Sequence, residues 1–349
     1  MELTAPELLV RLAPWWSRQT GHEVRLSAAE RIPGGASRQT WLIRAEDGAQ
    51  GQSEYVLRLD PDASLIETDR ALEFAALQAF QGTQVPVPEP LWMMSDPALL
   101  GGSFFVMRAV QGGIAAPLRL MQPPYAAHHA RMAERKWSVL GEIARADVPL
   151  EQIFGDAVRS GLVREQHDLD AQPCWARELA HWQAMLDADA LTPQPIQQAA
   201  IRWMRRHPPP PPQRLSVVHG DYRTGNLLYS PEGVLLAVLD WEMVHLGDPL
   251  EDLAWGLNRV WCFLNDERRG GLAPREQAIA IWEQASGLKA DPVALHWWEL
   301  LSCLKGQAIW LSAAKEYEEG RVDDSMMVTA AWMMINAQDR ATLELMGRL

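Results

Sequence analysis

Three oxygen-bearing side chains follow two apolar runs in the second half of the chain, in VVHGDYRTGNLL (217–228) and VLDWE (238–242). The runs lead into Asp221 and Asp240, and Asn226 comes five residues after Asp221. Oxygen ligands suit Mg²⁺, which keeps several waters and needs only one or two protein ligands. A carboxylate held nearby, but off the metal, can accept a proton from an attacking hydroxyl. The pattern predicts phosphoryl transfer with Asp221 as the base and with Asn226 and Asp240 on magnesium.

A structural alternative assigns Asp221 and Asn226 to turns and Asp240 to a loop cap. Each residue taken alone fits that alternative better. The three together, with His219 two residues before Asp221 and an apolar pair directly after Asn226, favour the catalytic interpretation.

Bulk composition excludes several other classes of protein. The 349 residues are 48% hydrophobic and 22% charged, which is typical of a globular chain with two domains or two lobes. A formal charge of −13 argues against nucleic acid or an anionic membrane as the main partner. The three cysteines are widely spaced, and no apolar run is long enough to span a bilayer. The start MELTAPELLVRL shows no basic region followed by an apolar core, so we expect no export signal. We expect a soluble, cytoplasmic protein that is either a monomer or a homodimer.

The elements that must position these residues divide near the QGG at 111–113, which predicts an N-terminal lobe over residues 1–110 and a C-terminal lobe over 111–349. The first lobe is predicted to be mostly antiparallel sheet, with strands at 40–44, 54–59, 90–94 and 103–110 and helices at 6–19 and 63–80. The second is predicted to be helical over 125–146, 175–187, 195–207, 274–286, 292–319 and 325–347. Five prolines at 208–212 form an extended spacer that leads into the short β-rich island with the motif.

The stretch VVHGDYRTGNLLYS…VLLAVLDWEMVHLGDPLEDLAW resembles the signature of the aminoglycoside phosphotransferase family, kinase-like enzymes that also include choline and related small-molecule kinases. Within that family it is most similar to the branch that occurs fused to, or alongside, acyl-CoA dehydrogenases. The resemblance implies an α+β, bilobal protein-kinase-like fold: an N-terminal antiparallel sheet lobe and a larger, mainly helical C-terminal lobe. It also implies ATP and Mg²⁺ as cofactors, and a small-molecule hydroxyl as the phosphoryl acceptor.

The resemblance assigns roles around the motif. His219 is expected to order the loop, and Asp248 and Asp252 to be structural, with Asp248 capping a helix that begins near residue 249. Glu242 is either a further metal or water ligand or an ordinary loop carboxylate. Arg223, two residues past the base, either joins the catalytic set by touching phosphate or a substrate anion, or pairs with a nearby carboxylate.

In the N-terminal lobe, PGGASRQTW lies where a loop covering the nucleotide is expected. Gly34, Gly35 and Ser37 would bring backbone N–H groups to the phosphates, although a plain hairpin turn is the better interpretation of two glycines alone. The segment FVMRAVQGG matches the hinge between the lobes, where backbone groups near Met107 and Ala109 would pair with adenine.

Kinases carry a lysine on the strand after this loop, and this chain has Arg58 in that position. An arginine keeps the positive charge and forks onto phosphate oxygens, with a different reach. Its partner on the following helix is expected to be Glu73, with Glu67 as the competing choice and a solvated glutamate as the structural alternative.

Two further functions compete with a small-molecule kinase. A protein kinase is disfavoured because GDPLEDLAW follows LDWE almost at once and leaves no room for a long activation segment. A catalytically silent nucleotide-binding scaffold is disfavoured because the base and both metal ligands are present. The acceptor is expected to be a hydroxyacyl compound, with an aminoglycoside or a choline-type alcohol as the alternatives.

Overall fold

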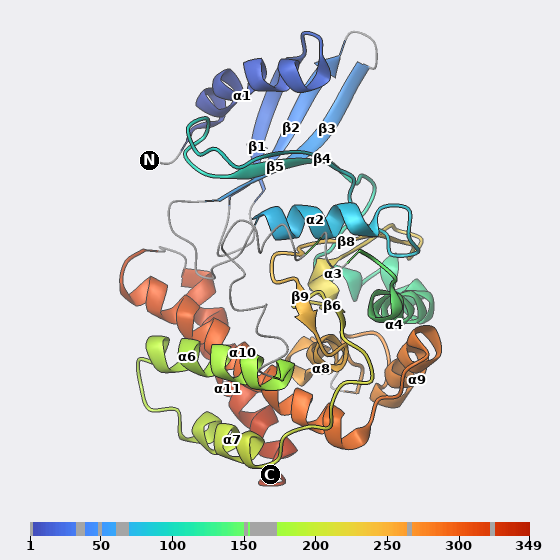
Figure 1. Ribbon diagram of the computed structural model, residues 1–349, viewed down its shortest axis with the longest axis vertical. Coiled ribbons are helices and arrows are strands. Elements are labelled where there is room, and N and C mark those ends of the chain that lie inside the picture. The colour runs from blue at the N-terminus through green and yellow to red at the C-terminus, as the bar shows by residue number, and fades with distance from the viewer. Residues whose placement is uncertain are drawn as a thin grey trace.

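The structure is a computed structural model that describes residues 3–32, 39–47, 51–60, 70–149, 153, 173–263, 267–321 and 325–349. Figure 1 shows a sheet-based N-terminal lobe above a larger, mainly helical C-terminal lobe. The α+β, bilobal architecture expected from the sequence is therefore confirmed.

The N-terminal lobe is built on an antiparallel sheet whose five described strands follow the order β1-β2-β3-β5-β4. The strands are β1 (Arg25–Arg31), β2 (Gln39–Asp47), β3 (Gly51–Leu59), β4 (Pro90–Met94) and β5 (Phe104–Arg108). Helix α1 (Ala5–Thr20) packs against this sheet and ends at Gly21, which has a left-handed backbone with φ 77°. The lobe has its own core, in which Trp15 and Trp16 from α1 pack on strand residues such as Phe104.

Helix α2 (Arg70–Phe80) lies below the sheet and faces the C-terminal lobe (Figure 1). Its apolar side belongs to the larger core, and Phe80 packs on Trp241, with their ring centroids 4.7 Å apart. The predicted helix began at residue 63, but residues 61–69, Glu67 among them, lie outside the described part of the chain.

The C-terminal lobe surrounds the long helix α10 (Pro292–Glu318), which packs against α6, α7, α8 and α11. Asp291 caps α10 by accepting hydrogen bonds from the backbone N–H groups of Val293 and Ala294. The other helical elements are α3 (Pro117–Leu120), η1 (Tyr125–His128), α4 (His129–Arg145), α6 (Cys174–Asp189), α7 (Pro195–Arg206), α8 (Leu250–Leu257), η4 (Arg259–Cys262), α9 (Arg275–Ser286) and α11 (Ser325–Leu345).

Two short strand pairs form the β-rich island: β6 (Ser216–Val218) with β9 (His245–Gly247), and β7 (Leu227–Tyr229) with β8 (Leu235–Val238). The loop from β6 to β7 includes η3 (Thr224–Asn226) and carries Asp221, and the loop from β8 to β9 carries Asp240. The backbone N–H of Val238 donates to the Pro86 carbonyl at 2.7 Å, which joins β8 to the segment after α2.

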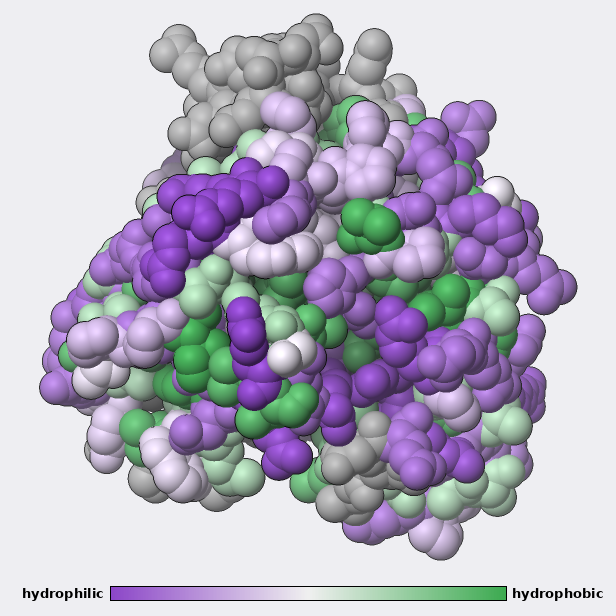
Figure 2. Space-filling view, turned by 90° about the horizontal axis from the view of Figure 1, so that it is seen from below, coloured by the Kyte–Doolittle hydropathy of each residue, from purple (hydrophilic) through white to green (hydrophobic). Residues whose placement is uncertain are grey.

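The face of the molecule seen from below has a mixed surface (Figure 2). Figure 2, seen from below, shows hydrophobic residues scattered among hydrophilic ones, and the exposed apolar side chains include Trp332 and Met333 of α11. Within the described ranges, no helix combines the length and the apolar character needed to cross a bilayer.

Candidate active site

The backbone around the proposed base is held by Asp252 on α8. Its carboxylate accepts hydrogen bonds from the backbone N–H groups of His219, at 2.6 Å, and Gly220, at 2.9 Å. Gly220 has φ 83°, and a Cβ atom there would lie 2.3 Å from the Met243 carbonyl oxygen, so a glycine is required. His219 Nε2 lies 3.0 Å from the Leu239 carbonyl oxygen. His219 and Asp252 therefore have the structural roles expected from the sequence.

Asp248 is also structural, although α8 begins at Leu250, one residue later than predicted. The Asp248 carboxylate accepts from the Leu250 backbone N–H at 2.9 Å and from Trp298 Nε1 at 3.1 Å. Burial raises the pKa of Asp248 to about 6. Its contacts anchor the start of α8 to α10, and so place Asp252 under the loop.

The carboxylate of Asp221 is held by three donors and is 15% exposed. Asn226 Nδ2 donates to Oδ2 at 2.7 Å, and Trp255 Nε1 donates to Oδ1 at 2.7 Å. Arg223 Nε lies 3.1 and 3.2 Å from the two oxygens. A carboxylate fixed in this way has a defined direction in which to accept a substrate proton.

Arg223 pairs with Asp221, which was one of the two alternatives left by the sequence. Its guanidinium also lies over the ring of Trp261, 5.3 Å from the centroid. Burial alone would lower the pKa of Arg223, but Asp221 and Asp240 raise it above its ordinary value. A contact between Arg223 and phosphate stays a prediction.

Asn226 and Asp240 provide an oxygen donor set that suits a hard divalent cation such as Mg²⁺. The Asn226 amide nitrogen is committed to Asp221, which leaves its amide oxygen as the ligand atom. The Asn226 carbonyl accepts from the Leu239 backbone N–H at 2.8 Å, which ties it to the residue before Asp240. Asp240 has a left-handed backbone with φ 65°, an uncommon conformation for a non-glycine residue. These residues therefore fit a magnesium site.

Arg58 on β3 joins the two lobes. Its Nη1 donates to Glu73 at 2.6 Å, and its Nη2 donates to Asp240 at 2.7 Å and to Glu242 at 3.0 Å. Arg70 is a second partner of Glu73, at 2.5 Å. Burial alone would lower the pKa of Arg58, but the three carboxylates raise it above its ordinary value. The Arg58–Glu73 pair expected from the sequence is present, and Glu242 belongs to the same ion cluster.

A cavity of about 930 Å³ lies between the sheet and the β-rich island. Its lining includes Arg58, Met107, Ala109, Asp240 and Glu242, which belong to both lobes. The Ala109 backbone N–H already donates to the Glu54 carbonyl at 3.1 Å, so adenine recognition there would use other backbone atoms. The predicted nucleotide-covering residues, Gly34, Gly35 and Ser37, lie outside the described part of the chain.

Two buried residues at the site were missed in the sequence. Trp255 binds Asp221, and it lies three residues after Asp252, on the same face of α8. This spacing could have revealed it. Lys136 on α4 donates to Thr224 Oγ1 at 3.0 Å, and burial, with Arg223 nearby, lowers its pKa to about 7. Only the fold brings α4 to this loop, and no sequence pattern indicated it.

Replacing Trp255 with Phe should slow turnover, because the ring stays while the donor to Asp221 is lost. A hydrogen bond to a charged group is worth about 2 kcal/mol, which corresponds to roughly 30-fold in kcat. The KM for nucleotide should stay near the wild-type value, as measured by steady-state kinetics. Trp282→Phe is a matched control, since this buried indole N–H has no hydrogen-bond partner among the described residues. Equal kinetic losses in the two variants would contradict a role of Trp255 at the base.

The sequence pattern of the phosphotransferase enzyme family (APH) matches residues 28–288. Acyl-CoA dehydrogenase family member 11 of Gallus gallus is 33% identical over 211 residues, which cover 59% of this chain and 25% of that protein. The chain spans 25% to 31% of the length of the first curated relatives it matches.

Solved structures share the fold. A Ralstonia eutropha protein described as a candidate aminoglycoside phosphotransferase superposes with a TM-score of 0.73 at 22% identity, over 97% of this chain and 98% of that one. The GDP and kanamycin complex of APH(2″)-IIIa superposes with a TM-score of 0.61 at 15% identity, over 93% and 96% of the two chains.

Proposed function

Because the chain belongs to the phosphotransferase enzyme family, we propose that it transfers the γ-phosphoryl group of Mg-ATP to a hydroxyl group of a small molecule. The observation that carries the proposal is the geometry of Asp221. Its carboxylate is oriented by Asn226, Arg223 and Trp255. The loop that carries it is joined to the cavity wall, which includes Arg58, Leu239 and Asp240, by the hydrogen bond from the Leu239 backbone N–H to the Asn226 carbonyl. This combination of a fixed base, a cation site and a basic group beside a cavity is what in-line phosphoryl transfer requires.

In the proposed reaction the acceptor hydroxyl oxygen attacks the γ-phosphorus, and the bond from that phosphorus to the β–γ bridging oxygen breaks. The proton of the hydroxyl passes to Asp221, and ADP leaves with the bridging oxygen. Asn226 and Asp240 would hold Mg²⁺, which would neutralise charge on the phosphate oxygens. Arg58 would add positive charge on the side of the N-terminal lobe, and Glu73 would keep it oriented.

For the acceptor we favour a hydroxylated acyl compound over an aminoglycoside. The curated relatives are named as acyl-CoA dehydrogenases, and this chain matches about a quarter to a third of their length, so a linked acyl substrate is chemically reasonable. The Asp221 carboxylate is contacted by Arg223, Trp255 and Asn226. The indole ring of Trp261 packs in turn against Arg223 and Trp255. A cationic and apolar surrounding suits an anionic acyl substrate better than a polycation.

An acceptor screen tests the proposal. The protein would be incubated with γ-labelled ATP and Mg²⁺ and with three panels: hydroxyacyl-CoA thioesters, aminoglycosides and choline-type alcohols. We expect label transfer to a hydroxyacyl compound and loss of transfer when EDTA removes Mg²⁺. Transfer to an aminoglycoside or an amino alcohol would correct the acceptor class. ATP binding without transfer or hydrolysis in any panel would instead favour the silent scaffold.

A further inference from the structure

A buried lysine on α10 contacts the loop between β6 and β7 that carries Asp221, which we call the catalytic loop (residues 219–226). Lys305 is 2% exposed, and its Nζ donates to the carbonyl oxygen of Gly220 at 2.5 Å. Gly220 directly precedes Asp221, so this hydrogen bond acts on the peptide unit that carries the proposed base. The ammonium also lies 5.1 Å from the ring centroids of both Trp182 and Trp255. Lys305 therefore touches the loop and one of the side chains that orient the base.

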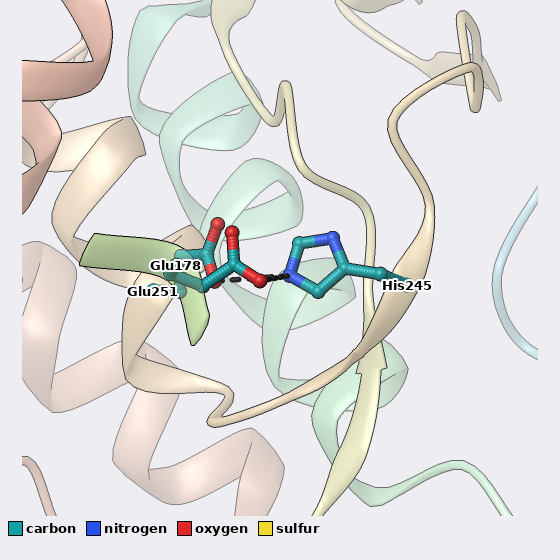
Figure 3. Close-up of side chains that lie close together, drawn as sticks. All are labelled: Glu178, His245 and Glu251. Atoms are coloured by element: carbon teal, nitrogen blue, oxygen red, sulfur yellow. Dashed lines mark hydrogen bonds and ion pairs between the residues drawn. The ribbon is translucent and has the colours of Figure 1, made fainter. Parts of the chain in front are cut away.

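The position of Lys305 depends in turn on a cluster of three side chains, Glu178, His245 and Glu251, which we call the buried charge cluster (Figure 3). Glu251 Oε1 lies 3.3 Å from Lys305 Nζ, and Glu251 Oε2 lies 3.0 Å from His245 Nε2. His245 Nε2 is 3.7 Å from Glu178 Oε1, and His245 Nδ1 faces the Met243 carbonyl oxygen at 2.9 Å. Because a carbonyl can only accept, Nδ1 carries a proton.

Charge balance makes this cluster an ion network and not a cation site. Each carboxylate already has a basic side chain besides His245: Lys305 for Glu251, and Arg177 at 3.2 Å for Glu178. With the imidazole protonated, two negative groups face three positive ones. A bound divalent cation would have to displace that proton and would leave still more uncompensated positive charge in a buried space.

The network joins elements that are distant in the sequence. Glu178 lies on α6, His245 on β9, Glu251 on α8 and Lys305 on α10, and the last contact is the backbone of the catalytic loop. Met243, which accepts from His245, is also the residue whose carbonyl packs on Gly220. Lys305 and Met243 therefore both contact Gly220, the residue before the proposed base.

We propose that Lys305 is a positioning residue for the catalytic base, and that the buried charge cluster keeps its ammonium directed at the Gly220 carbonyl. The effect on turnover rests on the proposed phosphotransfer function. The effect on the loop itself does not, and it can be measured without any substrate.

The test compares Lys305→Met with Lys315→Met. Both lysines lie on α10 and both pair with a carboxylate, but Lys315 binds Asp189 and does not touch the catalytic loop. Hydrogen–deuterium exchange followed by mass spectrometry should show faster exchange over residues 216–226 in Lys305→Met and unchanged exchange there in Lys315→Met. If Lys305→Met exchanges like the wild type over this segment, the proposal is wrong, whatever the protein catalyses.

Turnover provides the second readout. With an acceptor identified by the screen, kcat should fall 10- to 100-fold in Lys305→Met, while the KM for ATP changes by less than about threefold. If Lys305→Met does not fold, Glu251→Gln replaces it, because it keeps the side-chain shape and removes one charge beside Lys305. Wild-type levels of both exchange and kcat in Glu251→Gln would overturn the proposal. Absence of transfer by the wild type would refute the proposed function and leave the exchange comparison valid.

The pH dependence of stability tests the part played by His245. The charged and titratable groups around it are Glu178, Arg177 and His181 from α6, Asp248 from the turn before α8, Glu251 and Asp252 from α8, and Lys305 from α10. Burial alone would lower the pKa of His245, but Glu251 and Glu178 raise it to about 9. A raised pKa gives stability that is full below the unfolded value and is lost as the pH rises through about 9.

The wild type should therefore lose Tm between pH 7 and pH 9.5 more steeply than His245→Gln, as measured by calorimetry in matched buffers. Asp187→Asn, which removes an exposed carboxylate of α6, is the control and should follow the wild-type curve. If Tm falls with pH in parallel for the wild type and His245→Gln, His245 does not contribute its charge to the network.

Discussion

Replacing Asp221 with Asn is expected to reduce phosphoryl transfer by about three orders of magnitude, the scale of a lost general base. The amide is nearly isosteric but cannot take the hydroxyl proton. It also places an NH₂ group opposite donors, because Trp255, Arg223 and Asn226 all donate to this carboxylate. The loop should still form, since its backbone is held by Asp252 and not by Asp221.

The measurement separates chemistry from binding. Single-turnover transfer from γ-labelled ATP should nearly vanish in Asp221→Asn, while ATP affinity by calorimetry stays within about threefold of the wild type. Asp187→Asn, an exposed acid that pairs only with glutamines among its described hydrogen-bond partners, provides the matched charge change. Undiminished transfer by Asp221→Asn would remove Asp221 as the base and, with it, the mechanism proposed here.

Replacing Arg58 with Met should damage both function and stability. The guanidinium connects Glu73, Asp240 and Glu242, and no single ammonium or apolar side chain can reach all three in the same geometry. Loss of one partner from a buried ion cluster costs about 3 kcal/mol or more. Glu73 keeps Arg70, so the remaining penalty falls on Asp240 and Glu242, next to the proposed cation site. We expect transfer to fall by at least about a hundredfold.

Arg58→Lys distinguishes charge from geometry in this cluster. It retains the positive charge that the phosphates need but cannot fork, so its activity should lie between those of the wild type and Arg58→Met. Denaturant unfolding and transfer kinetics would be compared with those of Arg135→Met. That control loses an arginine bound to Glu142 and to a backbone carbonyl, at a place outside the cavity lining. If Arg58→Met transfers phosphate as well as Arg135→Met does, Arg58 has no catalytic role.

The sequence predicted most helices well because their apolar spacing is regular. The predicted helices at 195–207, 274–286 and 292–319 correspond to α7, α9 and α10 with one-residue differences at their ends. Strand β1 was missed because RLSAAER is an edge strand with few apolar residues and no full alternation of buried and exposed positions. Each of the four short island strands has only one to three buried residues, which is too little pattern to reveal its partner.

The residues of the candidate site also differ in whether a sequence pattern could indicate them. Asp221, Asn226 and Asp240 could be proposed because their spacing along the chain reflects one local motif. Arg58 could be proposed because it stands where kinases carry a lysine on the strand after the nucleotide-covering loop. Lys305 could not be identified, because it lies 84 residues after Asp221 in a mainly apolar stretch of α10, where a single lysine carries no pattern. Its partner in the loop is a backbone carbonyl, and backbone atoms leave no trace in a sequence.

The left-handed backbone of Asp240 affects how its role can be tested by mutation. At φ 65°, aspartate and asparagine are tolerated more readily than alanine, because their short polar side chains compensate locally for the crowding of Cβ. An alanine variant would therefore change two properties at once: the charge offered to the proposed cation and the conformational cost of the turn that carries Asp240. Asp240→Asn changes mainly the charge, and Asp240→Gly relieves the backbone while removing the ligand. Comparing these two substitutions divides any loss of activity between electrostatics and chain conformation, a division that the usual alanine scan would conceal.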